Sequence, residues 1–236
     1  MLCYNLPGGP RELKLSRAAY LGIFQGEITA WDDPLIREAN PGAVLPDTPI
    51  TVVRRAEGSG TTYVFTNHLN TVGKAIGKSW KLGVDKSIEW PNEMLGARGN
   101  PGVAALIEQT PGAIGYLEFG YAELTGLPTA LLENKTGMYV KASPETSQAA
   151  LEGAKLPADF RIWIPDPPGK HAYPIVTYTW ILCYDHYDDA RKAETLKKVL
   201  AYCLTDGQAC SKELGYIPLP SDIAAEVLKA VDRIKP

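Results

Sequence analysis

Short apolar runs alternate with segments of helical spacing over the first half of the chain. The runs predict strands, at residues 2–6, 50–54 and 113–117. The spaced apolar positions predict helices, at residues 17–25, from Thr62 and at residues 103–107. Asp33-Pro34 begins a further short helix, with proline just inside its start. Residues 131–139 predict a hairpin around the turn Glu133–Gly137. Strands that alternate with helices predict an α/β architecture.

The pattern changes after residue 153. Residues 153–172 are rich in proline and glycine, and Pro165–Gly169 cannot form a central element. Residues 175–184 then give the longest strand signal in the chain, with many β-branched and aromatic side chains. Two amphipathic helices follow, over residues 193–204 and 223–234. We therefore expect residues 7–165 and 173–236 to pack separately.

Composition narrows the possible functions. The 236-residue chain has a formal net charge of -3, which argues against nucleic acid and anionic membranes as partners. Its apolar runs fall short of the ~18–20 residues of a membrane span, and its first residues lack the pattern of a signal peptide. The cysteine and histidine spacings match no metal motif. Cys203 and Cys210 flank a predicted turn, which would bring them within disulfide reach.

The segment Arg55-Ala56-Glu57-Gly58-Ser59-Gly60-Thr61-Thr62 lies between a predicted strand and a predicted helix. The first amides of a helix have no partner inside it, and the helix dipole favours negative charge there. Arg55 adds a planar fork that can hold two oxygens at once. Ser59, Thr61 and Thr62 add hydroxyl donors, and the glycines allow close approach of the backbone. The pattern is typical of an oxyanion-binding loop.

Other motifs with similar glycine spacing do not fit. A P-loop requires lysine after its last glycine, where this chain has Thr61. A nucleophile elbow reads G-x-S-x-G, and here Glu57 and Thr61 occupy the outer positions. Donors with no catalytic base suit reversible binding. The alternative is a plain strand-to-helix turn in which Ser59 is only an N-cap, and the local pattern leaves both interpretations open.

Several segments, in order, resemble one family. They are residues 21–34 (LGIFQGEITAWDDP), 55–61 (RAEGSGT), 100–104 (NPGVA), 111–118 (PGAIGYLE), 173–175 (YPI) and 214–220 (LGYIPLP). Together they resemble the phosphate-binding proteins of bacterial phosphate ABC importers, the PstS type of periplasmic solute-binding protein. The resemblance runs through nearly the whole chain.

This resemblance implies a two-lobed periplasmic-binding-protein architecture of type II that closes on inorganic phosphate. It implies that Arg55, Ser59, Gly60 and Thr61 bind phosphate, and that Glu57 orients the arginine. No catalytic residue, metal or cofactor is expected. The expected partners are phosphate and the membrane subunits of an ABC transporter, and the expected location is periplasmic or at the cell surface.

The chain departs from the family pattern at its N-terminus, where the family has further phosphate-binding segments. We therefore expect one complete lobe, residues 7–165, and a partial second lobe made of residues 1–6 and 173–236. One alternative is a truncated or split lobe with weak or no phosphate binding. The other is a phosphoryl-handling enzyme, whose metal would need an acidic cluster such as Asp32-Asp33 or Asp188-Asp189.

Overall fold

The computed structural model describes residues 1–152 and 154–236. The strands are β1 (Leu2–Asn5), β2 (Lys14–Leu15), β3 (Thr51–Arg55), β4 (Leu95–Ala97), β5 (Ala113–Tyr116), β6 (Leu131–Glu133) and β7 (Tyr139–Val140). The helices are α1 (Arg17–Gln25), α2 (Pro34–Ala39), α3 (Gly60–Ala75), α4 (Gly99–Gln109), α5 (Phe119–Thr125), α6 (Pro144–Leu151), α7 (Ala190–Leu204), the 3₁₀ turn η1 (Asp206–Cys210) and α8 (Ser221–Val231).

The main sheet has the strand order β1-β5-β3-β4. Strand β3 runs parallel to both of its neighbours, and β1 pairs antiparallel with β5, with Tyr4 opposite Ile114. This pairing corrects the prediction that residues 1–6 belong with residues 173–236. The physical reason is that β3 pairs with only one side of β5, so the backbone groups on the other side of β5 are free to pair with β1. A second, smaller sheet has the order β2-β6-β7 and includes the predicted hairpin.

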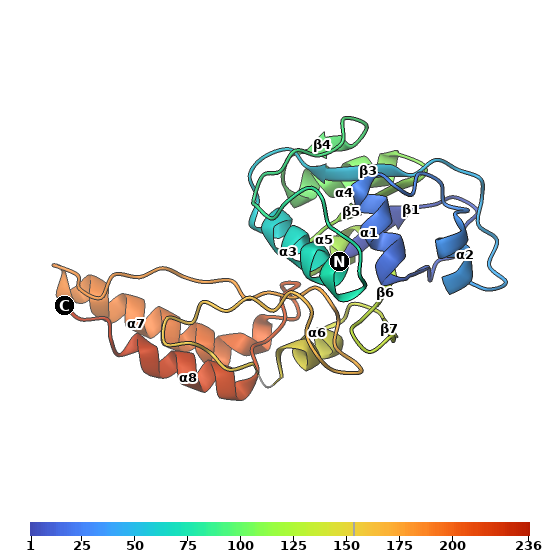
Figure 1. Ribbon diagram of the computed structural model, residues 1–236. Helices are drawn as coiled ribbons and strands as arrows, with labels where there is room; N and C mark the ends of the chain where they lie inside the picture. The colour runs from blue at the N-terminus through green and yellow to red at the C-terminus, as the bar shows by residue number, and fades with distance from the viewer. Residues whose placement is uncertain (153) are drawn as a thin grey trace.

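Alternate residues of the main sheet enter two separate cores, as the pleat of a strand requires. Val52 and Ile114 pack on one face with α1 and α3 residues such as Phe24 and Phe65, whose ring centroids lie 4.6 Å apart. Val53 and its neighbours pack on the other face with residues of α4 and α5. The sheet is thus covered by helices on both faces, which confirms the α/β prediction (Figure 1).

The chain between residues 165 and 173 is fixed to this body. The Asn134 amide donates to the carbonyls of Gly169, Lys170 and Ala172 at 3.2, 3.0 and 3.1 Å. Asp166 forms a buried ion pair with Arg17 at the start of α1. Tyr173 is buried in the main core. Residues 165–173, where the sequence predicts a separation, therefore pack with the first part of the chain.

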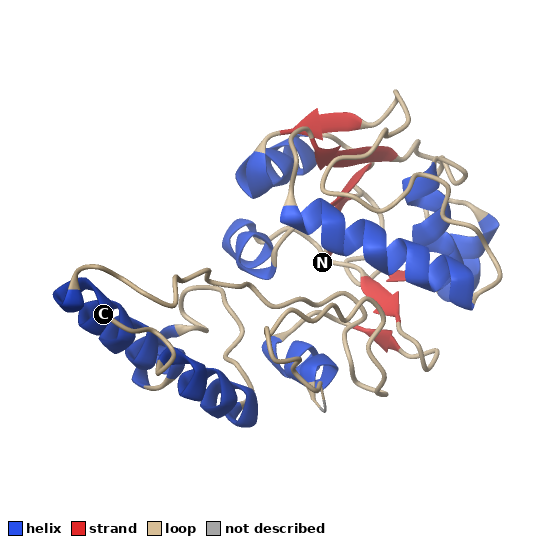
Figure 2. Cartoon of the chain, turned by 60° about the vertical axis from the view of Figure 1, so that its left-hand side comes forward, coloured by secondary structure: helices blue, strands red, loops and turns tan. Residues whose placement is uncertain are grey.

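Residues 190–231 form a helical pair. Helices α7 and α8 lie side by side and extend away from the sheet in both views (Figures 1 and 2). The amphipathic pattern of the sequence predicts both helices. Among the described residues of helix α7 only Ala193 is fully buried; Leu196, Leu200 and Leu204 are half-buried, and Val199 and Tyr202 are exposed.

The strand predicted over residues 175–184 is wrong: the segment belongs to none of the described strands. A strand is stable when a neighbour pairs with its backbone groups, and none of the described strands lies in register with this one. Ile181, Leu182 and Tyr184 are 69%, 93% and 78% exposed. The segment therefore has the apolar side chains of a strand, but no described residues pair with its backbone as a strand or bury Ile181, Leu182 and Tyr184.

Cys203 and Cys210 are exposed free thiols in the structure. Helix α7, which contains Cys203, ends as predicted at a turn that leads into η1, but the two thiols are not bridged. Among the described residues, no helix combines the length and the apolar character that crossing a bilayer requires.

Candidate anion-binding site

The loop between β3 and α3 is the strand-to-helix turn that the sequence predicts. Ser59 is the N-cap of α3, and its Oγ accepts hydrogen bonds from the amides of Thr61 at 3.1 Å and Thr62 at 3.4 Å. Helix α3 therefore starts at Gly60, two residues before the predicted Thr62. The Gly60 amide has no protein acceptor among the described residues. The loop thus keeps a free amide and the Ser59 hydroxyl proton at a helix N-terminus.

Arg55 ends β3, and its side chain is only 13% exposed. Its Nε donates to Glu57 Oε1 at 2.8 Å, and its Nη2 donates to the same oxygen. The guanidinium keeps both hydrogens of Nη1 and one hydrogen of Nη2, because those are not used by Glu57. This remaining edge is the fork that suits two oxygens of a tetrahedral anion.

Glu57 ties the loop to a second helix. Its Oε1 also accepts a hydrogen bond from the Gly99 amide, the first residue of α4, at 3.1 Å. The hydrogen bond from Arg55 is the main reason that the pKa of Glu57 is lowered to about 2, and the Gly99 amide adds to the effect. Glu57 is therefore ionised at neutral pH and orients the arginine, as the resemblance implies.

Tyr116 supports the same loop from β5. Its hydroxyl accepts a hydrogen bond from the Arg55 amide at 3.2 Å and shares a hydrogen with Thr62 Oγ1 at 2.7 Å. Thr62 is 1% exposed. Its hydroxyl therefore holds the loop to β5 rather than facing a ligand. The sequence alone predicts no role for Tyr116, although it lies within the segment at residues 111–118 that resembles the family.

Thr61 faces a carboxylate. Its Oγ1 donates to Glu118 Oε1 at 3.3 Å, across from the end of β5. On the other side of the loop, the Ser59 amide donates to the Lys86 carbonyl at 2.8 Å, and the Lys86 stem lies over Gly58. The structure thus brings Arg55, Ser59, Gly60 and Thr61 together in one loop, with Glu57, Tyr116 and Glu118 around it.

His68, the histidine nearest to the loop in sequence, is not placed to act as a base. It is fully buried, and its ring contacts the Pro165 carbonyl and the Tyr20 hydroxyl, the latter at 3.2 Å. Burial lowers its pKa to about 4. Among the described residues, Ser59 Oγ contacts the amides of Thr61 and Thr62 and no histidine, so it lacks the base that a nucleophilic serine needs.

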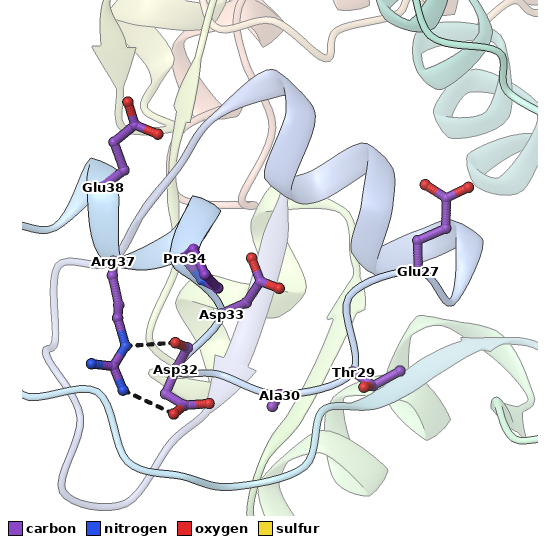
Figure 3. Close-up of a pocket in the computed structure, with 8 residues that line it drawn as sticks. All are labelled: Glu27, Thr29, Ala30, Asp32, Asp33, Pro34, Arg37 and Glu38. Carbon is purple, nitrogen blue, oxygen red and sulfur yellow. Dashed lines mark hydrogen bonds and ion pairs between the residues drawn. The ribbon is translucent and has the colours of Figure 1, made fainter.

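The acidic pair Asp32-Asp33 lines a hollow of about 800 Å³ at the start of α2, with Glu27 and Glu38 at its margin (Figure 3). Arg37 pairs with Asp32 at 2.8 Å, and Asp33 Oδ1 accepts from the Leu35 amide at 2.8 Å as the helix N-cap. An excess of carboxylates disfavours an anion in this hollow. Within residues 1–152 and 154–236, no His, Cys, Asp and Glu side chains cluster in a way that could hold a metal.

Comparison with known proteins agrees with this fold. Residues 1–206 match the model of the PBP superfamily domain. The chain is 38% identical to the phosphate-binding protein PstS of Methanocaldococcus jannaschii, over all of this chain and 65% of that protein. It is 36% identical to PstS of Haemophilus influenzae, over 94% of this chain and 67% of that protein.

Solved structures share the fold. A high affinity periplasmic phosphate-binding protein solved with phosphate bound aligns with a TM-score of 0.77 at 23% identity, over 96% of this chain and 67% of that one. A phosphate-binding protein from Stenotrophomonas maltophilia aligns with a TM-score of 0.72 at 21% identity, over 97% of this chain and 67% of that one. The chain spans 60–67% of the length of the PstS relatives compared with it. It belongs to the PBP superfamily and, within it, to the PstS family of phosphate-binding proteins.

Proposed function

We propose that the chain binds inorganic phosphate reversibly, and that Arg55, Ser59, Gly60 and Thr61 supply the donors. One observation carries the proposal: Glu57 holds Arg55 by one edge of its guanidinium, and neither the other edge nor the Gly60 amide of the same loop has a hydrogen-bond partner among the described residues. A preformed donor set of this kind binds an oxyanion without reorganising. The PstS relatives, which carry the name phosphate-binding protein, support phosphate as the anion.

We further propose that the chain acts outside the cytoplasmic membrane as the substrate-binding component of a phosphate ABC transporter, with the transporter's membrane subunits as partners. A related fold, an ABC-type phosphate transport receptor from Vibrio cholerae, supports this role by analogy, with a TM-score of 0.52. The proposed role is binding without catalysis, because the loop offers donors but no activated nucleophile.

A second candidate is a partial lobe that binds phosphate weakly. It is favoured by the uncovered apolar residues Ile181 and Leu182, which indicate that the C-terminal part lacks a packing partner among the described residues. Weak binding and tight binding differ in how far phosphate raises the melting temperature.

Thermal unfolding with and without phosphate tests the proposed function. A ligand at about 100 times its Kd stabilises the folded state by ~2.7 kcal/mol, which raises Tm by roughly 5–10 °C for a chain of this size. We expect a phosphate-dependent rise in Tm and no hydrolysis of p-nitrophenyl phosphate. No shift at millimolar phosphate would favour the partial lobe, and turnover would favour an enzyme.

A further inference from the structure

The connection between α3 and β4, residues 76–94, lies against the proposed anion loop. The Ser59 amide donates to the Lys86 carbonyl at 2.8 Å. Further along the connection, Trp90 stacks on Tyr116, whose hydroxyl holds the loop, with the ring centroids 6.1 Å apart. The backbone of Lys86 is therefore held beside the first turn of α3, although the proposed function gives this residue no role.

The side chain of Lys86 follows the backbone of the loop. A Cβ atom added at Gly58 would lie 3.8 Å from Lys86 Cγ and 3.9 Å from Lys86 Cδ, so the stem of the lysine covers Gly58. The ammonium is two bonds beyond Cδ, and it therefore stays within about 6–7 Å of that position. Lys86 is exposed, and the ion pairs that lysines form among the described residues do not include it. A free positive charge is thus held next to the loop.

The other charged side chains at the loop do not favour an anion by their sum. The charge of Arg55 is balanced by Glu57, which is ionised. Glu118 adds a carboxylate that accepts a hydrogen bond from Thr61 Oγ1 at 3.3 Å. These three residues together therefore carry a net negative charge, which works against the approach of a further anion.

Lys86 can offset this charge from the other side of the loop. Charges act on one another over about 10 Å at 0.1 M ionic strength. Gly58, which the lysine stem covers, is two residues from Gly60, the proposed amide donor. The Lys86 ammonium is therefore close enough to attract an anion at that amide without contacting it.

We propose that Lys86 is a further anion-attracting residue of this loop, whose ammonium raises the affinity for phosphate in a salt-dependent way. This inference rests on the proposed phosphate binding at Arg55–Thr61. A charge at the rim of a site acts at long range, and added salt weakens its effect. Because the ammonium is exposed, the gain is smaller than that from the nearly buried Arg55.

The test is calorimetric titration of the 236-residue protein with phosphate, at low salt and at high salt, for wild type and three variants. Lys86→Met keeps an unbranched stem over Gly58 and the backbone carbonyl but removes the charge, and Lys86→Arg keeps the charge. The control Lys74→Met removes an equal charge from an exposed position in the last turn of α3.

We expect Lys86→Met to weaken phosphate binding about two- to fivefold at low salt. The loss should shrink at high salt, where screening removes the attraction that the variant lacks. Lys86→Arg and Lys74→Met should bind phosphate as tightly as wild type at both salt concentrations.

The outcomes separate the two proposals. If wild type binds phosphate and Lys86→Met binds it equally well at low salt, this inference is wrong and the proposed function stands. Equal losses in Lys86→Met and Lys74→Met would overturn it, because net charge alone would then explain the effect. A loss that is the same at both salt concentrations, and that Lys86→Arg does not restore, would assign Lys86 a purely structural role. If wild type does not bind phosphate at either salt concentration, both proposals fail.

Discussion

Ser59 combines a structural contact with a proposed binding contact. Its Oγ accepts hydrogen bonds from the amides of Thr61 and Thr62. A serine that only caps the helix would make the same two bonds. Its hydroxyl proton is not consumed by accepting those bonds. The two interpretations left open by the sequence are therefore compatible at this residue, and a pair of variants can separate them.

Ser59→Ala should lower both stability and phosphate affinity. Loss of the cap costs ~1 kcal/mol of unfolding free energy, and loss of a neutral hydroxyl donor weakens phosphate binding by about three- to tenfold. The control is Ser16→Ala, which removes the matching cap of α1, where Ser16 Oγ accepts from the Ala19 amide at 3.2 Å. Urea unfolding and calorimetry measure the two effects. Equal phosphate affinity in both variants would mean that Ser59 is only a cap.

The contiguous residues of the site could be predicted from the sequence, and their surroundings could not. Arg55 to Thr61 lie in one short segment whose glycines and donors indicate an anion loop. The contacts of Tyr116 and Glu118 with that segment depend on the pairing of β5 with β3, across about sixty positions of sequence. Glu57 meets Gly99 only because α4 begins beside the loop. Local patterns carry no information about such pairings.

At the scale of elements, helices α1 and α3 hold the segment that leads to the C-terminal part. His68 on α3 contacts the Pro165 carbonyl, and Arg17 of α1 pairs with the neighbouring Asp166. The Tyr20 hydroxyl joins the same buried group through His68. Breaking a buried pair by removing one partner is costly, so this contact fixes where the chain leaves the main body.

Acid should weaken this contact through His68. Burial lowers the pKa of His68 to about 4, below the usual 6.5, so the unfolded chain binds a proton that the folded chain does not. Unfolding free energy should therefore fall as pH drops from about 6.5 to about 4, by up to ~3 kcal/mol from this group. His68→Gln should remove that part of the slope, and His171→Gln, at an exposed position, should not. Urea unfolding between pH 7 and 4.5 provides the measurement, and equal slopes in all three proteins would contradict the assignment.

The sequence predicts the helices more reliably than the long C-terminal strand. A helix satisfies its backbone within its own sequence, so caps such as Ser16 and Asp33 locate it directly. A strand depends on neighbours, and residues 175–184 have no paired strand among the described residues. For the same reason, the predicted grouping of residues 1–6 with the C-terminal part is wrong: an antiparallel partner such as β5 cannot be identified from the run Leu2–Leu6 alone.

At the scale of the whole molecule, exposed apolar residues gather in the C-terminal third. Ile181, Leu182, Val199, Tyr202, Leu214 and Tyr216 are each more than half exposed. Exposed apolar side chains favour association when they come together on a surface. The main body exposes single residues such as Val44 and Leu124, which is normal for a protein surface.

We expect the 236-residue chain to self-associate through this region. Its mass from light scattering should exceed that of a monomer and rise with concentration. The double variant Ile181→Ser, Leu182→Ser should reduce the association, because it removes two of the exposed apolar side chains. The control Val44→Ser, Leu124→Ser changes equally exposed residues of the main body and should have little effect. A monodisperse wild-type monomer would show that the surface does not drive association.

The central claim is that the loop from Arg55 to Thr61 binds phosphate, and Arg55 tests it most directly. Calorimetric titration with phosphate should compare wild type, Arg55→Ala and Arg37→Ala, the last of which removes an exposed arginine paired with Asp32. Removing one partner of a hydrogen-bonded charge pair costs ~2–5 kcal/mol, or roughly thirty- to several-thousand-fold in Kd. We therefore expect Arg55→Ala to lose that much affinity while Arg37→Ala stays close to wild type. Absence of phosphate binding by wild type, or a loss of less than about threefold in Arg55→Ala, would contradict the assignment of the site.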